Sequence, residues 1–391
     1  MTYRIRTLNR ISARALERLP PGRYESSASL DDADAIIVRS ADLHSLVLPP
    51  TVKAIGRAGV GTNNIPVDEM SARGIPVFNA PGGNANAVCE LVLGMIVMAA
   101  RNVVPALSFV AELEGDDLES RIESSKSRFA GVEIASRTLG VIGLGAIGGL
   151  VAEGAAKLGM RVLGFDPYLK SDAAHRIPAC VHRVGTLEEL LGASQFVTLH
   201  VPLAPATRHL IDSRALSHLP HDAVLLNFAR DAIVDRDAVR DAVRGGRLRS
   251  YVCDFPDASF AREPRIVALP HLGASTAQAE ENCALMVVDE VRDYLEHGTI
   301  RNAVNFPDVE MARESSYRVG IANANVPNML GQISSTMARA GLNIHNMVNK
   351  SRGEMAYTLV DVDSEVDGTV IQAIAAIKGV LSVRLIPDLG D

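Results

Sequence analysis

Short apolar runs alternate with amphipathic stretches along most of this chain. Before residue 84, β-rich runs occur at 35–40 (AIIVRS), 52–60 (VKAIGRAGV) and 75–81 (IPVFNAP), and the segment between the last two predicts a helix that ends at Gly74. From Thr138 onward, helical stretches separate six further strand-like runs: TLGVIGLG, MRVLGFD, SQFVTLHVP, AVLLNFAR, SYVCDFP and RIVALP. This alternation predicts two series of strand–helix units, each built on a mostly parallel sheet.

Three longer segments have helical patterns: an apolar one at 84–101, a charged one at 113–128, and one at 276–297 that ends at Gly298. A polar linker is expected at 310–317. After it the order of elements changes to β-α-β-β-α-β, with strands expected at SYRVGIAN, NIHNMVNKSRG, EMAYTLVDVD and VLSVRLI. This order is typical of a small ferredoxin-like module.

Composition limits the possible functions. The 391 residues suit two or three domains, and 47% hydrophobic residues are enough for sizeable cores. Aromatic residues make up only 4% without any Trp, and the net charge is −7, which argues against binding to nucleic acid or to an anionic membrane. The N-terminal residues lack a signal-peptide core, and the longest apolar helix, interrupted by Cys89–Glu90, is too short to span a bilayer. The scattered cysteines indicate neither a disulfide framework nor a metal site, so we expect a cytoplasmic protein. The cysteines are Cys89, Cys180, Cys253 and Cys283.

A glycine-rich motif opens the second series of strands. GLGAIG places Gly143, Gly145 and Gly148 between the apolar run TLGVI and a helix, and Asp166 ends the next strand, 18 residues after Gly148. Such a loop lets a pyrophosphate approach the helix N-terminus, and the acidic residue accepts hydrogen bonds from ribose hydroxyls while repelling a 2′-phosphate. The motif therefore predicts an NAD site; the alternative is a glycine-rich packing turn.

Three candidate catalytic or binding residues follow later strands of the same series. Arg230, Asp254 and His271 each lie just beyond a strand-like run, at the sheet edge where open α/β folds bind ligands. An arginine can hold an α-keto acid carboxylate through two hydrogen bonds, and a histidine exchanges protons near neutral pH. Together with NAD they indicate oxidoreduction of a 2-hydroxy acid. The alternative for His271 is a surface or structural role.

The motifs resemble those of the D-isomer-specific 2-hydroxyacid dehydrogenases. The resemblance covers almost the whole chain: RAGVGTNNI, NAPGGNANAV, GVIGLGAIG, LHVPL, NFARD and PHLGAST. It implies an α/β fold of two Rossmann-like doubly wound lobes followed by a ferredoxin-like ACT domain. Residues 1–90, completed by 273–305, are then the substrate-binding lobe, 91–272 the NAD-binding domain, and 317–391 the ACT regulatory domain.

The resemblance also implies roles for individual residues. Arg230 and His271 are expected to be catalytic. The expected NAD contacts are Gly143, Gly145, Ala146, Ile147, Gly148, Asp166, His200, Val201, Pro202, Ala229, Asp254 and Gly273. The expected substrate contacts are Arg39 and Arg57 with the loop Gly59, Val60 and Gly61, whose backbone N–H groups can cradle a carboxylate. The alternative for the two arginines is an ion pair inside the first lobe.

Two positions depart from the family pattern. Members of the family usually carry a glutamate three residues after the phenylalanine of D-V-F-x-x-E-P, where this chain has Ala258. That glutamate orients the catalytic histidine, so Asp257, another acidic residue, or a water or backbone carbonyl must replace it here. Glu263 precedes His271 by only eight residues and is a poor equivalent. Asp231 stands where the family more often has glycine, and could either compete for Arg230 or turn outward.

The implied reaction is NAD-dependent oxidation of 3-phospho-D-glycerate to 3-phosphohydroxypyruvate, the first step of L-serine biosynthesis. The alternatives are a dehydrogenase for 2-hydroxyglutarate, hydroxypyruvate or glyoxylate, and a non-catalytic NAD-binding regulator. L-Serine is expected as an effector at Asn323, Asn325 and Asn343, although asparagine also favours turns. A homodimer or homotetramer is expected, with the apolar helix at 87–100 either in its interface or in the core.

Overall fold

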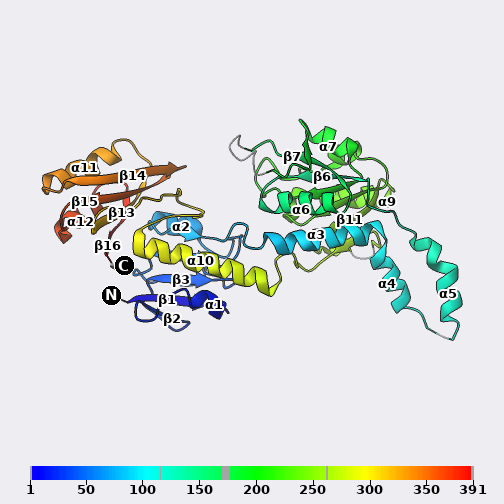
Figure 1. Cartoon of the computed structure of the whole chain (residues 1–391), viewed down its shortest axis with the longest axis horizontal. Coiled ribbons are helices and arrows are strands. Elements are labelled where there is room, and N and C mark those ends of the chain that lie inside the picture. Colours follow the sequence, from blue (N-terminus) through cyan, green and yellow to red (C-terminus); the bar gives the residue numbers. More distant parts are fainter. Residues whose placement is uncertain (1, 115, 170–176, 261–262, 389–391) are drawn as a thin grey trace. The chain divides into compact units, whose positions relative to one another are not determined.

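The computed structural model describes residues 2–114, 116–169, 177–260 and 263–388. Its contacts divide the chain into two units: Met1–Asn84 with Ala277–Asp391, and Ala85–Thr276. The predicted fold class is confirmed, because the structure contains two parallel sheets and a separate antiparallel sheet near the C-terminus (Figure 1). Among the described residues no single helix could cross a membrane. By length and composition alone α3 (Ala85–Ala100) and α4 (Val103–Ala111) could do so together, as a pair bent by 70°.

The first unit begins with a five-stranded parallel sheet in the order β2-β1-β3-β4-β5. Its strands are β1 (Tyr3–Leu8), β2 (Tyr24–Ser27), β3 (Ala35–Val38), β4 (Ala54–Arg57) and β5 (Val77–Phe78). Its helices are α1 (Ala13–Leu16), α2 (Val67–Ala72) and α10 (Ala277–His297). Alternate residues of β3 separate two cores: Ile37 packs with the buried face of α10, and Ile36 packs with α2. Gly74 (φ +69°) and Gly298 (φ +71°) end α2 and α10 in the left-handed conformation expected from the sequence.

The C-terminal module of the first unit has the predicted β-α-β-β-α-β order. Its elements are β13 (Tyr317–Ala324), α11 (Met329–Arg339), β14 (Ile344–Arg352), β15 (Met355–Val362), α12 (Gly368–Ala375) and β16 (Val380–Ile386). One face of its sheet packs on α11 and α12, whereas Tyr357, Leu359 and Ile386 on the other face join the core around α10. The Arg384 guanidinium also lies 4.4 Å from the ring centroid of Tyr294 on α10. The module and the first sheet therefore share one hydrophobic core.

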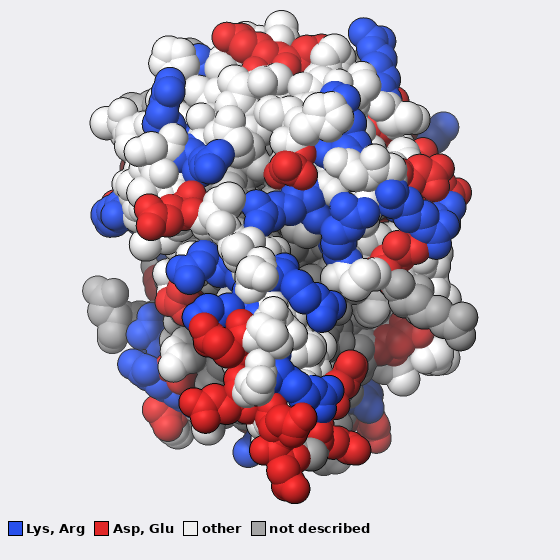
Figure 2. Space-filling model, turned by 90° about the vertical axis from the view of Figure 1, so that its right-hand side faces the viewer, with Lys and Arg blue, Asp and Glu red and all other residues white. Residues whose placement is uncertain are grey.

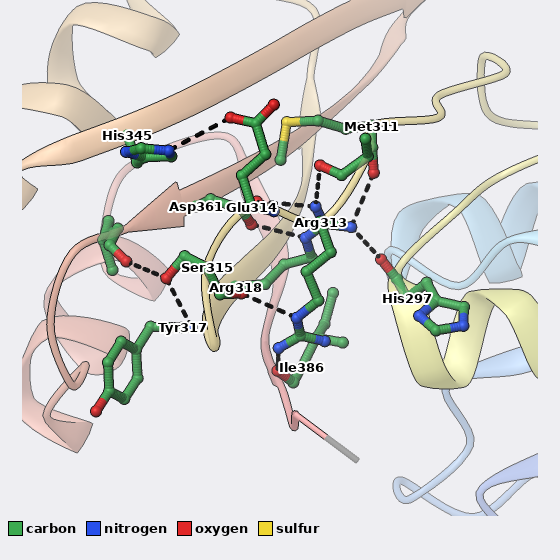
Figure 3. Close-up of polar contacts among 12 residues, drawn as sticks. His297, Met311, Arg313, Glu314, Ser315, Tyr317, Arg318, His345, Asp361 and Ile386 are labelled. Carbon is green, nitrogen blue, oxygen red and sulfur yellow. Dashed lines mark hydrogen bonds and ion pairs between the residues drawn. The ribbon is translucent and has the colours of Figure 1, made fainter. Parts of the chain in front are cut away.

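The expected polar linker is closely packed through Arg318, which is fully buried at the start of β13 (Figure 3). Its guanidinium donates to both carboxylate oxygens of Asp361, at 2.7 and 2.9 Å. It also donates to the backbone carbonyls of His297, Met311 and Ala312. One side chain thus joins the end of α10, the linker and two strands of the module.

The second unit is built on a seven-stranded parallel sheet in the order β12-β11-β10-β9-β6-β7-β8. Its strands are β6 (Thr138–Ile142), β7 (Arg161–Phe165), β8 (Val181–Arg183), β9 (Phe196–Leu199), β10 (Ala223–Asn227), β11 (Leu248–Cys253) and β12 (Ile266–Ala268). Its helices are α3 (Ala85–Ala100), α4 (Val103–Ala111), α5 (Leu118–Ser125), α6 (Ala146–Lys157), α7 (Leu187–Ala193), α8 (Ser213–His218) and α9 (Arg236–Arg244), with 3-10 turns at Lys126–Phe129, Asp231–Ile233 and Ala258–Phe260. Helices α3 and α6 cover one face of this sheet, and α7, α8 and α9 cover the other.

Candidate functional site

The carboxyl edge of the seven-stranded sheet brings most of the predicted site residues together. All seven strands are parallel, so the loops that follow them lie along one edge. Read across the sheet, these loops carry His271 (after β12), Asp254 (β11), Arg230 (β10), His200 (β9), Gly143 (β6) and Asp166 (β7). Three strand spacings separate β10 from β7, about 14 Å. The catalytic candidates and the acidic ribose-binding candidate therefore lie on opposite sides of the glycine-rich loop.

Each glycine of the motif has its own structural explanation. Gly143 has φ +92°, and a side chain there would come within 2.8 Å of the backbone carbonyl of His200. Gly148, in α6, allows close packing, since a Cβ atom would lie 1.9 Å from the Gly143 carbonyl oxygen. Gly145 faces open space with no atom near its missing side chain. An open glycine at a helix N-terminus is what a pyrophosphate needs for close approach, so the loop fits a dinucleotide.

Asp166 supports the glycine-rich loop through its carboxylate. One oxygen accepts the backbone N–H of Leu144 at 3.0 Å, and the other accepts that of Tyr168, also at 3.0 Å. Each carboxylate oxygen has a second lone pair, so the same group can also accept a ribose hydroxyl. Asp166 thus fits the role expected for NAD.

His200 has a neutral, enclosed imidazole. Its Nε2 atom lies 3.0 Å from the Thr198 hydroxyl, and its buried Nδ1 atom has no hydrogen-bond partner among the described residues. Burial lowers the pKa of His200 to about 3, so the ring does not act as a proton donor at neutral pH. The ring therefore shapes this edge. Val201 is half-buried against the core of the second unit, and Pro202 is exposed.

Arg230 is exposed, and its guanidinium donates to the backbone carbonyl of Ala229 at 2.7 Å. The backbone of its loop is held by Asn227, whose side-chain amide donates to the Arg230 carbonyl. The neighbouring Asp231 forms an ion pair with Arg236 instead. Asp231 has turned away, which leaves the Arg230 charge available for an anionic ligand.

His271 lies in a loop that Asp254 fixes. The Asp254 carboxylate is buried at 1% exposure and accepts the backbone N–H groups of Leu272 and Gly273, both at 2.7 Å. These two bonds hold His271 in the left-handed region, with φ +59°, a conformation that costs free energy for a residue with a side chain. The imidazole is exposed and packs edge-on against Phe255, with ring centroids 5.4 Å apart.

Asp257, one of the alternatives for the partner of His271, is bound elsewhere in this structure. One Asp257 oxygen accepts from Arg236 at 2.7 Å, and the other accepts the backbone N–H of Ser259 at 2.8 Å. The hydrogen bonds from Ser259, assisted by the charge of Arg236, lower the pKa of Asp257. Glu263 pairs with Arg244. Within the described part of the chain, no carboxylate contacts the His271 imidazole. Arg236, which pairs with both Asp231 and Asp257, was not identified from the sequence because only the fold brings these residues together.

The predicted anion-binding residues of the first unit lie at the carboxyl ends of neighbouring strands. Val38 pairs with Arg57 in the register of β3 and β4, so Arg39 and Arg57 reach the same edge. The Arg57 guanidinium covers Gly59, since a Cβ atom on Gly59 would lie 1.6 Å from it. Arg39 forms an ion pair with Glu280 in the first turn of α10, as the alternative interpretation allowed.

The three predicted effector residues are not brought together within one module. Asn325 donates to the Gly353 carbonyl near the start of β15, whereas the backbone of Asn343 pairs with Asp363 beyond the end of β15. The length of β15, roughly 24 Å, separates the two sites. Asn323 is buried in β13 at 1% exposure, and its amide donates to the Ala324 carbonyl.

Comparisons with known proteins agree with this geometry. Residues 93–273 match the family model "D-isomer specific 2-hydroxyacid dehydrogenase, NAD binding domain". A D-3-phosphoglycerate dehydrogenase of Haemophilus influenzae is 32% identical, over 86% of this chain and 82% of its own length. The chain belongs to the D-isomer specific 2-hydroxyacid dehydrogenase family. A second D-3-phosphoglycerate dehydrogenase, from Methanocaldococcus jannaschii, is 31% identical over 93% of this chain, which spans 66% of that protein's length.

The fold has a solved counterpart with its cofactor bound. The NAD+-bound 3-phosphoglycerate dehydrogenase of Entamoeba histolytica aligns with a TM-score of 0.61 and 26% identity, covering 78% of this chain and 99% of that one. The family model describes an NAD-binding domain, so NAD is the cofactor of the second unit and the chain is an NAD-dependent dehydrogenase. The glycine-rich loop and Asp166 are the features of this chain that suit NAD.

Proposed function

We propose that this chain oxidises 3-phospho-D-glycerate to 3-phosphohydroxypyruvate, the first step of L-serine biosynthesis. The observation that carries the proposal is the match, over most of the chain, to relatives named D-3-phosphoglycerate dehydrogenase. Two arginines at one sheet edge of the first unit supply positive charge for the phosphate-bearing substrate.

The catalytic roles follow from the chemistry of the exposed side chains. Bound NAD supplies the hydride acceptor for C2 of the substrate. Arg230 holds the substrate carboxylate and polarises the forming carbonyl, and His271 accepts the hydroxyl proton. Asp254 acts indirectly, because its two backbone hydrogen bonds fix the loop that presents His271. We further propose Ala146, Ile147, Ala229 and Gly273 as backbone contacts of the cofactor.

A side-by-side substrate comparison tests the proposal. The purified protein should oxidise NADH fastest with 3-phosphohydroxypyruvate, and more slowly with hydroxypyruvate and 2-oxoglutarate. His271→Ala should abolish turnover while NADH binding, measured by nucleotide fluorescence, is retained. A preference for 2-oxoglutarate would favour a 2-hydroxyglutarate dehydrogenase. Normal NADH binding without turnover of any 2-oxo acid would favour the non-catalytic regulator. The motivating observation for that alternative is that no carboxylate among the described residues contacts the His271 imidazole.

We also propose that the chain forms a homo-oligomer through the segment that carries α4 and α5. Figure 1 shows these helices extending from the rest of the second unit, and α4 has no buried residue. Leu107 and Val110 on α4 are 62% and 52% exposed. Figure 2 shows acidic side chains gathered at the lower end of one face. Asp116, just before α5, and Glu119, in its first turn, line one surface hollow. The helix at 87–100 belongs mainly to the core, because α3 has eight buried residues. Leu107→Glu with Val110→Glu should lower the molar mass measured by light scattering.

An L-serine effector at the C-terminal module belongs to the same proposal. Asn325 and Asn343 lie at opposite ends of β15, so a ligand that contacts both positions needs residues from two copies of the module. Strand β14 is an edge of the antiparallel sheet and can pair with a second copy. Calorimetry without heat from L-serine would exclude the effector.

A cytoplasmic location is proposed on the cysteines, all four of which are free.

A further inference from the structure

Arg39, a proposed phosphate-binding residue, already has an anionic partner within its own unit. One terminal guanidinium nitrogen of Arg39 lies 2.5 Å from a carboxylate oxygen of Glu280, in the first turn of α10. Both side chains are partly exposed, at 37% and 42%, so solvent and dissolved anions reach the pair. The contact joins α10 to the loop that follows β3, and the two residues are 241 positions apart in the sequence.

A second arginine and a closely packed loop lie near the Arg39–Glu280 pair. The charges of Arg57 and Arg39 both lower the pKa of Cys283, although burial raises it more, so both guanidiniums lie near this turn of α10. Gly83 packs directly on Cys283, since a Cβ atom there would lie 2.9 Å from the sulfur. Glu280 thus places a carboxylate at the same sheet edge where two arginines are proposed to receive an anionic substrate.

We propose that Glu280 is an internal counter-ion that occupies Arg39 until the phosphate of the substrate displaces it, and thereby sets the affinity for phosphorylated ligands. This inference rests on the proposed function, because it assigns the phosphate to Arg39. A phosphate must replace the carboxylate at the guanidinium and also approach the displaced negative charge. Both effects weaken phosphate binding, whereas a ligand without phosphate leaves the pair intact.

The size of the effect follows from the exposure of the pair. Partly exposed ion pairs contribute modestly to stability, so removing the competing charge should strengthen phosphate binding about two- to fivefold. The effect should shrink as salt rises, because counter-ions screen solvent-accessible charges.

The test uses Glu280→Gln, which keeps the shape and one acceptor oxygen but removes the charge. Glu281→Gln is the matched control, since Glu281 is the next residue of α10 and pairs with Arg14 at 2.5 Å. KM is measured for 3-phosphohydroxypyruvate and for hydroxypyruvate, and the Kd of inorganic phosphate is measured by phosphorus NMR. Both substitutions are then repeated in an Arg39→Gln background.

Glu280→Gln should lower both the KM for 3-phosphohydroxypyruvate and the Kd of phosphate about two- to fivefold, with the KM for hydroxypyruvate unchanged. Glu281→Gln should change none of these constants, and the Glu280→Gln effect should disappear in the Arg39→Gln background. An unchanged affinity for phosphate would overturn the inference, because Glu280 would then not compete for Arg39. A weaker affinity would also overturn it, and would mean that Glu280 holds Arg39 in its binding position. Tighter phosphate binding in a protein that does not turn over the phosphorylated substrate would instead reject the proposed function and retain this inference.

Discussion

Arg318→Met tests how strongly the buried ion pair holds the C-terminal module to the rest of its unit. Methionine has a similar length but no hydrogen-bond donor. The substitution leaves the fully buried Asp361 carboxylate with the backbone N–H of Glu314, at 3.1 Å, as its remaining donor among the described residues. The backbone carbonyls of His297, Met311 and Ala312 also lose the donor that now satisfies them.

The expected cost is large compared with the stability of a domain. Removing one partner of a buried ion pair costs about 3–5 kcal/mol, since the other charge is left unpaired in a low-dielectric interior. Whole domains are stable by only about 5–15 kcal/mol, so the linker and β13 should open far more often in the variant. Replacing Asp361 with leucine as well should recover part of the loss, because no buried charge then remains.

Trypsin cleavage after Arg313 reports this opening. Arg313 lies in the linker, and its guanidinium donates to the backbone carbonyls of Ser315, Ser316, Ile386 and Pro387, so cleavage requires local opening. A loss of about 3 kcal/mol raises the open population, and hence the cleavage rate, more than a hundredfold.

Arg301→Met is the matched control for this measurement. Arg301 also binds a carboxylate through two nitrogens, at 3.1 and 3.3 Å from Glu310, but the two side chains are 51% and 66% exposed. An exposed pair of this kind is worth at most about 1 kcal/mol, so cleavage should accelerate less than about fivefold. If Arg318→Met also stayed within this range, the argument from the buried pair would be refuted.

Three further predictions concern single side chains. Asp166→Ala should raise the KM for NAD about 10- to 100-fold through loss of charge-assisted hydrogen bonds and should reduce discrimination against NADP; steady-state kinetics with both cofactors would detect a failure of either part. Asp254→Asn should lower kcat about tenfold or more with a smaller change in NADH affinity, because the amide NH2 cannot accept one of the two backbone N–H groups and that hydrogen bond is lost. Equal effects on kcat and on NADH affinity in stopped-flow measurements would contradict a role in positioning His271. Glu290 is buried, and burial raises its pKa from the ordinary 4.5 to about 8. The folded state therefore loses stability relative to the unfolded state as pH rises from 4.5 to 8. Glu290→Gln should therefore have a Tm advantage that grows between pH 5 and pH 8, whereas a constant difference in thermal melts would disprove the assignment.

Hydrophobic pattern was sufficient to predict most strands of the second unit but not all of them. Six of its strands are apolar runs, and their buried residues appear directly in the sequence. Strand β8 is only VHR, three residues without full burial, so periodicity gives no signal for it. In the first unit, β2 is the short, mostly exposed edge strand YESS and is equally difficult to recognise. Short edge strands form because a neighbouring strand offers hydrogen bonds, and the hydrophobic pattern of the short segment itself does not predict that pairing.

Long-range pairing explains the other differences between sequence and structure. The segment 310–317 has the composition of a solvated linker, yet Arg313 and Arg318 bind backbone carbonyls from distant elements. Glu280 and Arg39 are separated by most of the chain. The glycine-rich loop is different, because its spacing between an apolar strand and a helix identifies it even though the steric partner of Gly143, the His200 backbone, is distant in the sequence.

The two departures from the family pattern near the catalytic candidates are physically linked. Arg236 pairs with both Asp231 and Asp257. Asp231 stands where the family more often has glycine, and Asp257 lies next to the position of the missing glutamate, so the two departures share one cation. These carboxylates therefore stabilise the loops around the site and neither one orients His271. What remains for orientation is the Asp254 clamp on the backbone and the edge contact with Phe255. A fixed backbone leaves two side-chain torsions of the imidazole to be ordered in the complex, at a cost of about 0.5–1.5 kcal/mol. That cost reduces the rate by up to about tenfold, so the proton transfer proposed for His271 does not require a carboxylate partner beyond the described residues that contact it.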